Sequence, residues 1–227
     1  MVVLVLQTLK QDLQNYVKAK QMGWRMTELV VVLFDTETTG LLKPKVSDIH
    51  LQPQVIEYYG MKVVHRADGV IEKIDEFETY LRPAKEFNES VITKITGITN
   101  AMIKSAPTFF DIHKKLLEFY SGVDRIVAHN CAFDDAMVKN EYLRLATDEQ
   151  ITVDEFHDAI AQINSMKKLC TVQKTMFIQQ RRLSLTNLHQ ELFGKPFDNA
   201  HRARNDVEAL FDCYVELCKR GIIVWFT

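Results

Sequence analysis

Four acidic residues stand at the edges of apolar segments, where their carboxylates could bind a cation. Asp35 and Glu37 follow the apolar run LVVVLF at residues 29–34, and the alternation of a strand sends both side chains to one side. Asp134 and Asp206 each fall near the start of a predicted helix. Neighbouring carboxylates repel each other unless a proton or a cation lies between them. Because hard oxygen ligands suit Mg²⁺ or Mn²⁺, the pattern indicates a divalent-cation site.

His201 is the residue best suited to proton transfer beside these acids. It precedes Asp206 by five residues at the start of the last predicted helix, so both side chains can face one cleft. An imidazole, with a reference pKa near 6.5, can accept a proton from water at neutral pH. Each segment alone also has a simpler interpretation. Asp-x-Glu followed by threonines suits a turn, and a histidine and an acid at a helix start are often cap or surface residues.

The hydrophobic pattern predicts an α/β chain that would position these residues. Strands are expected at residues 29–34, 54–65, 70–81, 125–128 and 169–171, with Asp68-Gly69 turning the second strand into the third as a hairpin. Helical spacing predicts helices at about 88–94, 99–104, 108–120, 132–145, 155–165, 172–179, 184–193 and 200–220. Asn130 is expected to cap the helix that carries Asp134.

Composition bounds the class of protein. The chain has 227 residues, of which 47% are hydrophobic, and 28 basic residues face 30 acidic ones, so the formal charge is −2. This excludes a disordered polymer, a collagen-like chain and a protein that coats polyanions through bulk positive charge. The four cysteines form no C-x-x-C pair, and the short apolar N-terminus lacks the features of a secretion signal. We therefore expect a cytoplasmic protein with reduced thiols and no membrane association.

Three segments taken together resemble one enzyme family. They are F-D-T-E-T-T-G at 34–40, H-N-C-A-F-D at 129–134 and H-R-A-R-N-D at 201–206. In this order they are similar to the three motifs of the DEDDh family of 3′–5′ exonucleases, which includes the epsilon proofreading subunit of bacterial DNA polymerase III. The related tyrosine branch would have Tyr where this chain has Arg202, so the histidine branch is indicated. The likeness spans about residues 29–219.

The resemblance implies a fold and a mechanism. The fold is RNase H-like, with a central five-stranded mixed sheet flanked by helices, in which three antiparallel strands precede two strands parallel to the first. Asp35, Glu37, Asp134 and Asp206 would bind two Mg²⁺ or Mn²⁺ ions about 4 Å apart, with Glu37 and His201 as catalytic residues and His201 as the general base. The product would be a 5′-mononucleotide released from a 3′ end. Residues 29–227 form the expected exonuclease domain.

The resemblance also implies residues that hold the substrate. The terminal nucleotide would contact Thr36, Thr38, Leu41, Glu57, Phe133 and Arg202, with Glu57 bonded to the 3′-hydroxyl. For Leu41 and Phe133, packing into the core is the competing interpretation. Basic clusters near Arg181-Arg182 and Arg202/Arg204 are candidates for tracking a phosphate backbone, although charged runs on helices are usually solvated faces.

Substrate and partners are only partly fixed by these residues. We expect single-stranded or frayed DNA 3′ ends as the substrate, with an exoribonuclease acting on RNA ends as the alternative, because no motif recognises the 2′-hydroxyl. A non-catalytic nucleic-acid-binding module of the same fold is the rival from another class. Proofreading would require a polymerase as a separate partner chain. Residues 1–28 are predicted as a helical extension with an amphipathic helix over 4–20. Packing of its leucine face onto the domain is the simplest role, with dimerisation and polymerase docking as alternatives, and the oligomeric state stays open.

Overall fold

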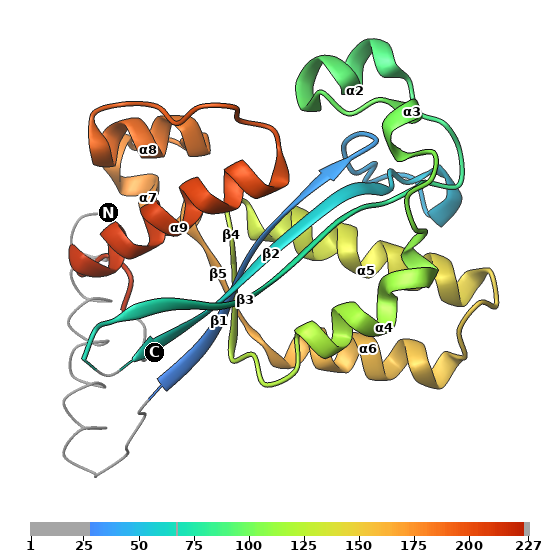
Figure 1. The fold of residues 1–227 in the computed structure, drawn as a ribbon, viewed down its shortest axis with the longest axis horizontal. Coiled ribbons are helices and arrows are strands. Elements are labelled where there is room, and N and C mark those ends of the chain that lie inside the picture. The colour runs from blue at the N-terminus through green and yellow to red at the C-terminus, as the bar shows by residue number, and fades with distance from the viewer. Residues whose placement is uncertain (1–27, 67, 225–227) are drawn as a thin grey trace.

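Five strands form one mixed sheet in the computed structural model, which describes residues 28–66 and 68–224 (Figure 1). The order is β3-β2-β1-β4-β5. β1 (Glu28–Thr38) pairs antiparallel with β2 (Val55–Arg66), and β2 pairs antiparallel with β3 (Ile71–Tyr80). β4 (Arg125–Ala128) and β5 (Lys167–Cys170) extend the sheet parallel to β1. The predicted fold class is confirmed.

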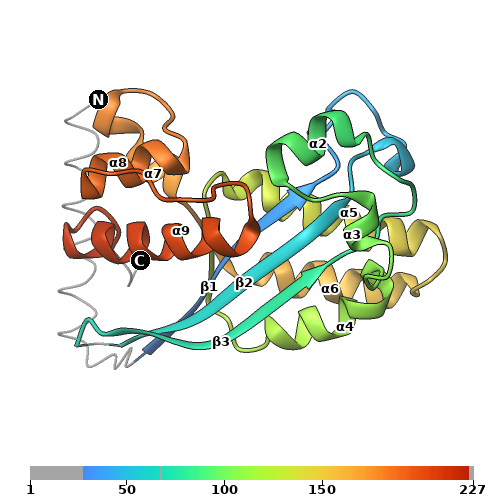
Figure 2. The ribbon, with the colours of Figure 1, turned by 45° about the horizontal axis from the view of Figure 1, so that its top comes forward.

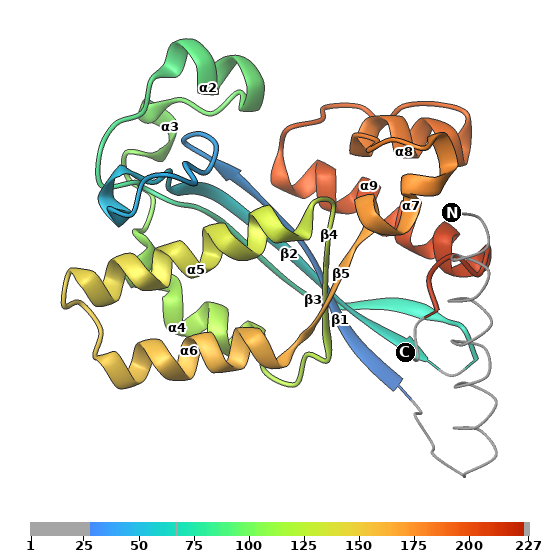
Figure 3. The same cartoon turned by 180° about the vertical axis from the view of Figure 1, so that it is seen from behind.

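Helices cover both faces of this sheet (Figures 1 and 3). One face carries α4 (Phe109–Phe119), α5 (Cys131–Thr147) and α6 (Val153–Ser165). The opposite face carries α7 (Thr171–Gln179), α8 (Leu185–Phe193) and α9 (Ala203–Lys219). The central strand therefore lies between two helical layers, as expected for its continuous apolar run.

Alternation along β1 assigns its side chains to the two layers. Val32 and Phe34 pack in the core formed with α4, α5 and α6, whereas Val31 and Leu33 pack in the core formed with α8 and α9. Since successive side chains of a strand point to opposite faces, Asp35 continues the row of Leu33 toward α9. Thr36 continues the row of Phe34 toward α5.

A smaller helical unit stands at the end of the sheet where β1 terminates (Figure 2). It consists of α2 (Glu89–Thr96) and α3 (Asn100–Ile103), with a short 3₁₀ turn at Ile49–Leu51 in the loop after β1. Ile56, Ile98 and Ile103 are buried in a third apolar cluster that joins the unit to β2. The loops and helices around the end of β1 thus form the surroundings of its acidic residues.

Most predicted elements are present, with shifted boundaries at two places that matter. β1 continues to Thr38, four residues beyond the predicted end, and α9 begins at Ala203, three residues later than predicted. The predicted helix at 4–20 lies outside the described residues. Cys131, Cys170, Cys213 and Cys218 are unpaired thiols. Within the part of the chain that the structure describes, none of the helices has the length and apolar content that a bilayer crossing requires.

Candidate active site

Asp35 and Glu37 lie within the last residues of β1 rather than after it. The pairing with β2 continues through Asp35 opposite Tyr59 and Glu37 opposite Glu57, and the register shifts only after Glu37. Continued ladder hydrogen bonding holds the backbone extended, so the alternation predicted from the sequence applies to both acids. Glu37 is 9% exposed, and its cross-strand neighbour Glu57 is 2% exposed.

Asp134 reaches the site from the first turn of α5. β4 ends at Ala128 beside β1, and α5 starts at Cys131, so the beginning of α5 lies close to the end of β1. Oδ1 of Asp134 accepts a 2.8 Å hydrogen bond from Thr36 Oγ1 and a 3.2 Å bond from the Thr36 backbone N–H. Thr36 therefore orients the Asp134 carboxylate from the face of β1 opposite to Asp35.

Asp206 and His201 complete the group from α9 and the loop before it. Asp206 lies in the first turn of α9, and its carboxylate accepts the backbone N–H of His201 at 3.0 Å. One potential ligand atom from each of Glu37, His201 and Asp206 lies within 4.8 Å of the others. The fold thus brings together residues that are more than 160 positions apart in the sequence, as the motif pattern predicted.

The electrostatics of the cluster show that its negative charge is poorly compensated. Burial, followed by repulsion from Asp134, Glu37 and Asp206, raises the pKa of Asp35 well above its usual range. Burial and the neighbouring acids raise the pKa of Glu37 to about 8, although nearby Arg202 opposes this shift. Burial raises the pKa of Asp134 to about 7 and that of Asp206 to about 6, in each case against the effect of their hydrogen bonds.

The donor set fits hard divalent cations. Within residues 28–66 and 68–224, no lysine or arginine forms an ion pair with Asp35, Glu37, Asp134 or Asp206. Carboxylates whose charged forms are destabilised by burial and mutual repulsion are stabilised by bound positive charge. Oxygen ligands favour Mg²⁺ or Mn²⁺ over softer metals. The four acids can therefore hold cations that polarise a phosphate ester.

The residues predicted to contact substrate occupy different environments. The Thr36 side chain is used to orient Asp134, and Thr38 Oγ1 donates to Gly40 O at 2.7 Å in the turn after β1. Leu41 is 79% exposed, which removes core packing as the explanation for its position. Phe133 is half-buried and packs against the apolar cluster around α5. Leu41 is thus the residue most open to a ligand.

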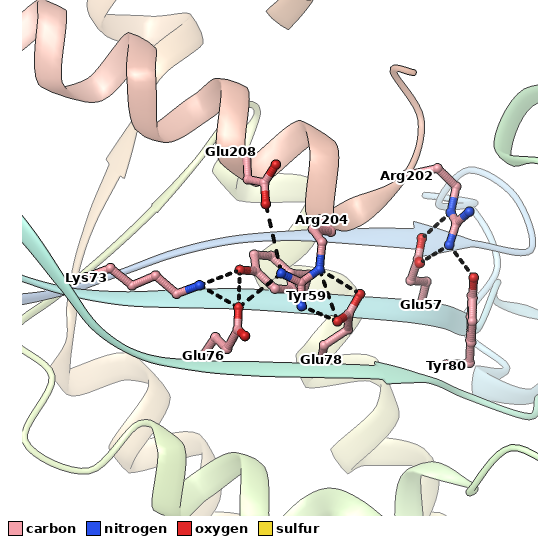
Figure 4. A network of polar contacts seen from close by, with 9 residues as sticks. All are labelled: Glu57, Tyr59, Lys73, Glu76, Glu78, Tyr80, Arg202, Arg204 and Glu208. Atoms are coloured by element: carbon pink, nitrogen blue, oxygen red, sulfur yellow. Dashed lines mark hydrogen bonds and ion pairs between the residues drawn. The ribbon is translucent and has the colours of Figure 1, made fainter. Parts of the chain in front are cut away.

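Arg202 and Glu57, also predicted to contact substrate, contact each other (Figure 4). Arg202 Nη2 donates to Glu57 Oε1 at 2.9 Å, and the guanidinium also donates to the Tyr80 hydroxyl. Arg204, two residues later, lies over the Tyr59 ring and pairs with Glu78. Sequence patterns gave no signal for these contacts, because Tyr80 and Glu78 belong to no motif and lie more than 120 residues away.

The junction between β4 and α5 differs from the prediction in one detail. Asn130 occupies the N-cap position of α5, as predicted, but its backbone is left-handed, with φ of 84°, and its side chain makes no capping hydrogen bond. Its Oδ1 instead accepts a 2.7 Å hydrogen bond from Arg182. His129 braces the junction, because its ring contacts Thr171 Oγ1 at 2.9 Å and Leu183 O at 3.0 Å. The loop before α8 is thereby tied to the start of α5.

Comparison with known protein families gives a match over most of the chain. Residues 32–214 match the family described as RNase T exonuclease. This range contains all three motifs, all of β2 to β5, and most of β1 and α9. The match extends well beyond the short segments around the acids.

Comparison with individual proteins gives similarity to proteins named as DNA polymerase III. A PolC-type DNA polymerase III from Caldanaerobacter subterraneus subsp. tengcongensis is 28% identical over 189 residues, which is 83% of this chain and 12% of that protein. The DNA polymerase III subunit epsilon of Buchnera aphidicola subsp. Schizaphis graminum is 29% identical over 173 residues, which is 76% of this chain and 70% of that subunit. The chain therefore spans only a small part of the PolC-type relative.

A solved structure shares the fold. It is described as "3′-end specific recognition of histone mRNA stem-loop by 3′-exonuclease", with a TM-score of 0.61, 15% sequence identity, and coverage of 95% of this chain and 74% of that one. At this identity the similarity establishes the RNase H-like architecture alone.

Proposed function

The chain belongs to the RNase T exonuclease family, as a 3′–5′ exonuclease of the DEDDh type, and on that premise we propose that it removes nucleotides from single-stranded or frayed DNA 3′ ends with two bound divalent cations. The observation that carries the proposal is the convergence of Asp35, Glu37, Asp134, Asp206 and His201 from three distant parts of the chain. A non-catalytic module has no need to keep four mutually repelling acids.

The four acids hold the cations in this proposal. When bound, Mg²⁺ or Mn²⁺ supplies positive charge that polarises the scissile phosphodiester, lowers the pKa of water and stabilises the leaving 3′-oxygen. Asp35 and Glu37 provide ligands from the α9 side of β1, Asp206 from α9, and Asp134 from α5. Thr36 keeps the Asp134 carboxylate oriented through its two hydrogen bonds.

His201 accepts the proton of the attacking water at an imidazole nitrogen. Its side chain is exposed and lies beside Glu37 and Asp206, so it can reach water at the edge of the cation site. We assign it this role rather than that of a ligand, because the four carboxylates already supply the oxygen ligands that Mg²⁺ prefers. General bases of this kind contribute about 10²- to 10⁴-fold to a rate.

The substrate assignment is supported by the relatives and by the surroundings of β1. Both polymerase relatives are named as DNA polymerase III proteins, which favours DNA and a proofreading role beside a polymerase. In this proposal exposed Leu41, the Thr36–Thr38 backbone and Phe133, which belong to the first two motifs or directly follow them, contact the terminal nucleotide. A chain with a formal charge of −2 has no excess of positive charge with which to bind a long stretch of nucleic acid. Contact with the terminal nucleotide alone does not require such an excess.

Matched oligonucleotides test the substrate. Single-stranded DNA and RNA of one sequence, labelled at the 5′ end, are incubated with the protein and Mg²⁺ or Mn²⁺. We expect stepwise shortening of the DNA, release of 5′-mononucleotides, and inhibition by EDTA or by a 3′-phosphate. Faster shortening of the RNA would overturn the DNA assignment and leave the exonuclease chemistry intact.

Substitutions test the site. We expect Asp35→Ala and Asp206→Asn each to lower turnover by at least about 10³-fold, since each removes a cation ligand. Asp212→Asn, which changes an exposed acid on the same helix as Asp206, is the matched control and should keep wild-type turnover. His201→Ala should lower turnover strongly while Mn²⁺ binding, measured by calorimetry, is mostly kept. Undiminished turnover in Asp35→Ala would contradict the ligand assignment.

A further inference from the structure

The first backbone N–H group of α9 is hydrogen-bonded by a side chain from a distant strand. Arg202 occupies the N-cap position, and its side chain makes no capping hydrogen bond. The first N–H groups of a helix need acceptors, and here the Ala203 N–H donates to Glu57 Oε2 at 3.0 Å. Glu57 lies on β2 and is separated from Ala203 by 146 positions. The first turn of α9 is therefore fixed to the sheet as well as to its own loop, where Asp206 accepts the His201 N–H.

The same carboxylate also fixes Arg202. Arg202 Nη2 contacts Glu57 Oε1 at 2.9 Å and Nε contacts Oε2 at 3.3 Å, which is a two-point pairing of guanidinium and carboxylate. The guanidinium also donates to the Tyr80 hydroxyl on β3 and lies 5.5 Å from the Tyr80 ring centre. Glu57 is 2% exposed, so the pair is sheltered on one side from water.

These contacts bracket His201. The His201 backbone has a φ of 69°, a left-handed conformation that a residue with a side chain adopts at a cost in free energy. Its N–H is bonded to Asp206 on one side, and Arg202 and Ala203 are bonded to Glu57 on the other. The place of the imidazole beside Glu37 and Asp206 therefore depends on how firmly residues 202 and 203 are held.

We propose that Arg202 and Glu57 are positioning residues that act through His201, a role that rests on the proposed exonuclease function. Both oxygens of Glu57 and two donor nitrogens of Arg202 are engaged with each other or with Ala203. These bonds hold the start of α9 to β2 and β3, so a positioning role accounts for both residues without a direct contact with substrate. Misplacing a reacting group by about 1 Å can lower a rate by about 100-fold.

Kinetics of Arg202→Gln test the proposal. We expect kcat to fall by about 10- to 100-fold with KM for single-stranded DNA changed less than about twofold, because His201 is displaced while substrate binding is unaffected. Arg202→Lys keeps the charge but not the two-point pairing, and should fall between Arg202→Gln and wild type. In a His201→Ala background, Arg202→Gln should change the remaining activity by less than about twofold. Full additivity of the two changes, or a large rise in KM, would overturn the proposal in favour of substrate contact.

The neighbouring ion pair provides a matched control. Arg204 and Glu78 also join α9 to the sheet, and Arg204 Nε lies 3.1 Å from both Glu78 oxygens. Glu78→Gln removes an ion pair whose two side chains are both exposed, so it should lower the melting temperature less than Arg202→Gln, which leaves the buried Glu57 carboxylate unpaired. Its kcat should stay near the wild-type value. An equal fall in kcat for both variants would mean that the effect is general loss of α9 packing, which contradicts the proposal.

Amide hydrogen exchange examines the positioning without relying on activity. We expect the amides of His201 and Ala203 to exchange faster in Arg202→Gln and in Glu57→Gln, and to keep wild-type rates in Glu78→Gln. Unchanged exchange at His201 in all three variants would contradict the positioning role. Absence of nucleotide release from the wild-type protein would instead contradict the proposed function, and the exchange data separate the two failures.

Discussion

The Thr36 hydroxyl lies 2.8 Å from Oδ1 of Asp134 and donates a hydrogen bond to it across the junction between β1 and α5. Thr36 is flanked in sequence by Asp35 and Glu37, whose side chains point to the opposite face of the sheet. One strand end thus contributes two acids to the site on one face and orients a third acid from the other. The motif Asp-Thr-Glu accordingly has a structural role at every position.

Thr36→Val should weaken cation binding. The hydrogen bonds from Thr36 lower the pKa of Asp134, so loss of the hydroxyl raises that pKa further, and the carboxylate becomes a poorer ligand at neutral pH. A hydrogen bond to a charged group is worth about 1.5 to 3 kcal/mol, so we expect half-saturation to require about tenfold more Mn²⁺. Turnover is measured against Mn²⁺ concentration, and Thr36→Ser, which keeps the hydroxyl, should resemble wild type. An unchanged Mn²⁺ requirement in Thr36→Val would contradict this role.

Stability of the cation-free protein should fall as the pH rises from about 5 to 8. The pKa values of Glu37, Asp134 and Asp206, about 8, 7 and 6, lie above those of unfolded acids, so the folded state holds protons that the unfolded state releases. Between its pKa in the unfolded state and its pKa in the folded state, each such group lowers the free energy of unfolding by about 1.4 kcal/mol per pH unit. Urea denaturation in EDTA at several pH values measures the slope. Added Mn²⁺ should stabilise the protein more at pH 8 than at pH 5.5.

Asp35→Asn is the control for this pH dependence. It removes one buried charge, so we expect higher stability than wild type at pH 8 in EDTA and a smaller slope. Burial lowers the pKa of His65 to about 4, so this residue makes the stability of both proteins increase as the pH rises toward about 6.5. Its contribution is the same in the two proteins and cancels when they are compared. A parallel pH dependence in the two proteins would show that the acidic cluster is not its source.

Arg144→Met should destabilise the protein by about 3 to 5 kcal/mol, because it leaves a buried carboxylate unpaired. Arg144 Nη1 contacts Glu141 Oε2 at 2.7 Å, and Nη2 contacts the carbonyls of Ile49 and Pro53 at 3.1 and 3.3 Å. Urea denaturation gives the change in unfolding free energy. Adding Glu141→Gln should recover part of the loss, since Gln can still accept the Val55 N–H. A loss below about 1 kcal/mol would be inconsistent with a buried pair.

Gly60→Ala should destabilise the protein by about 1 to 3 kcal/mol through crowding. A Cβ at Gly60 would lie 2.8 Å from Phe119 Cε1 and 2.9 Å from the Tyr58 hydroxyl oxygen, both in the apolar cluster beneath α4. Thermal unfolding measures the effect. Combining Gly60→Ala with Phe119→Leu, which frees space, should cost less than the sum of the two single changes. Strict additivity would argue that the rings move aside without strain.

Sequence patterns predicted the strands and helices because their strongest signals are local, whereas the arrangement of the sheet was implied by the resemblance of the three motifs. The continuous apolar run of β1, the Asp-Gly hairpin and the helical spacing each reflect packing that the structure confirms. The end of β1 was predicted too early, because Asp35 and Glu37 are poor strand formers that tertiary pairing with β2 overrides. Similarly, α9 was predicted to start too early, since positive φ at Asn199 and His201 cannot be foreseen from composition.

The candidate site was predictable to the extent that its residues lie in motifs. Asp35, Glu37, Asp134, Asp206 and His201 follow from three spaced segments, and the structure places them together. The partners of Arg202 and Arg204 were not predictable, since Glu57, Tyr80 and Glu78 meet them only after β2 and β3 pack beneath α9. Arg202 and Arg204 lie near a motif, which suggested that they contact phosphates. In the structure they form ion pairs with Glu57 and Glu78 of the sheet instead.

The separation of the site's contributors along the chain has a consequence for biosynthesis. The strands β1, β2 and β3 are neighbours in the sequence and can pair early, whereas Asp206 arrives only with α9, which contacts β1 across more than 160 residues. Long-range contacts of this kind form slowly, because closure of the intervening loop costs entropy. A nascent chain therefore carries no competent nuclease until α9 has left the ribosome and docked. During refolding, helical circular dichroism should recover before nucleotide release does.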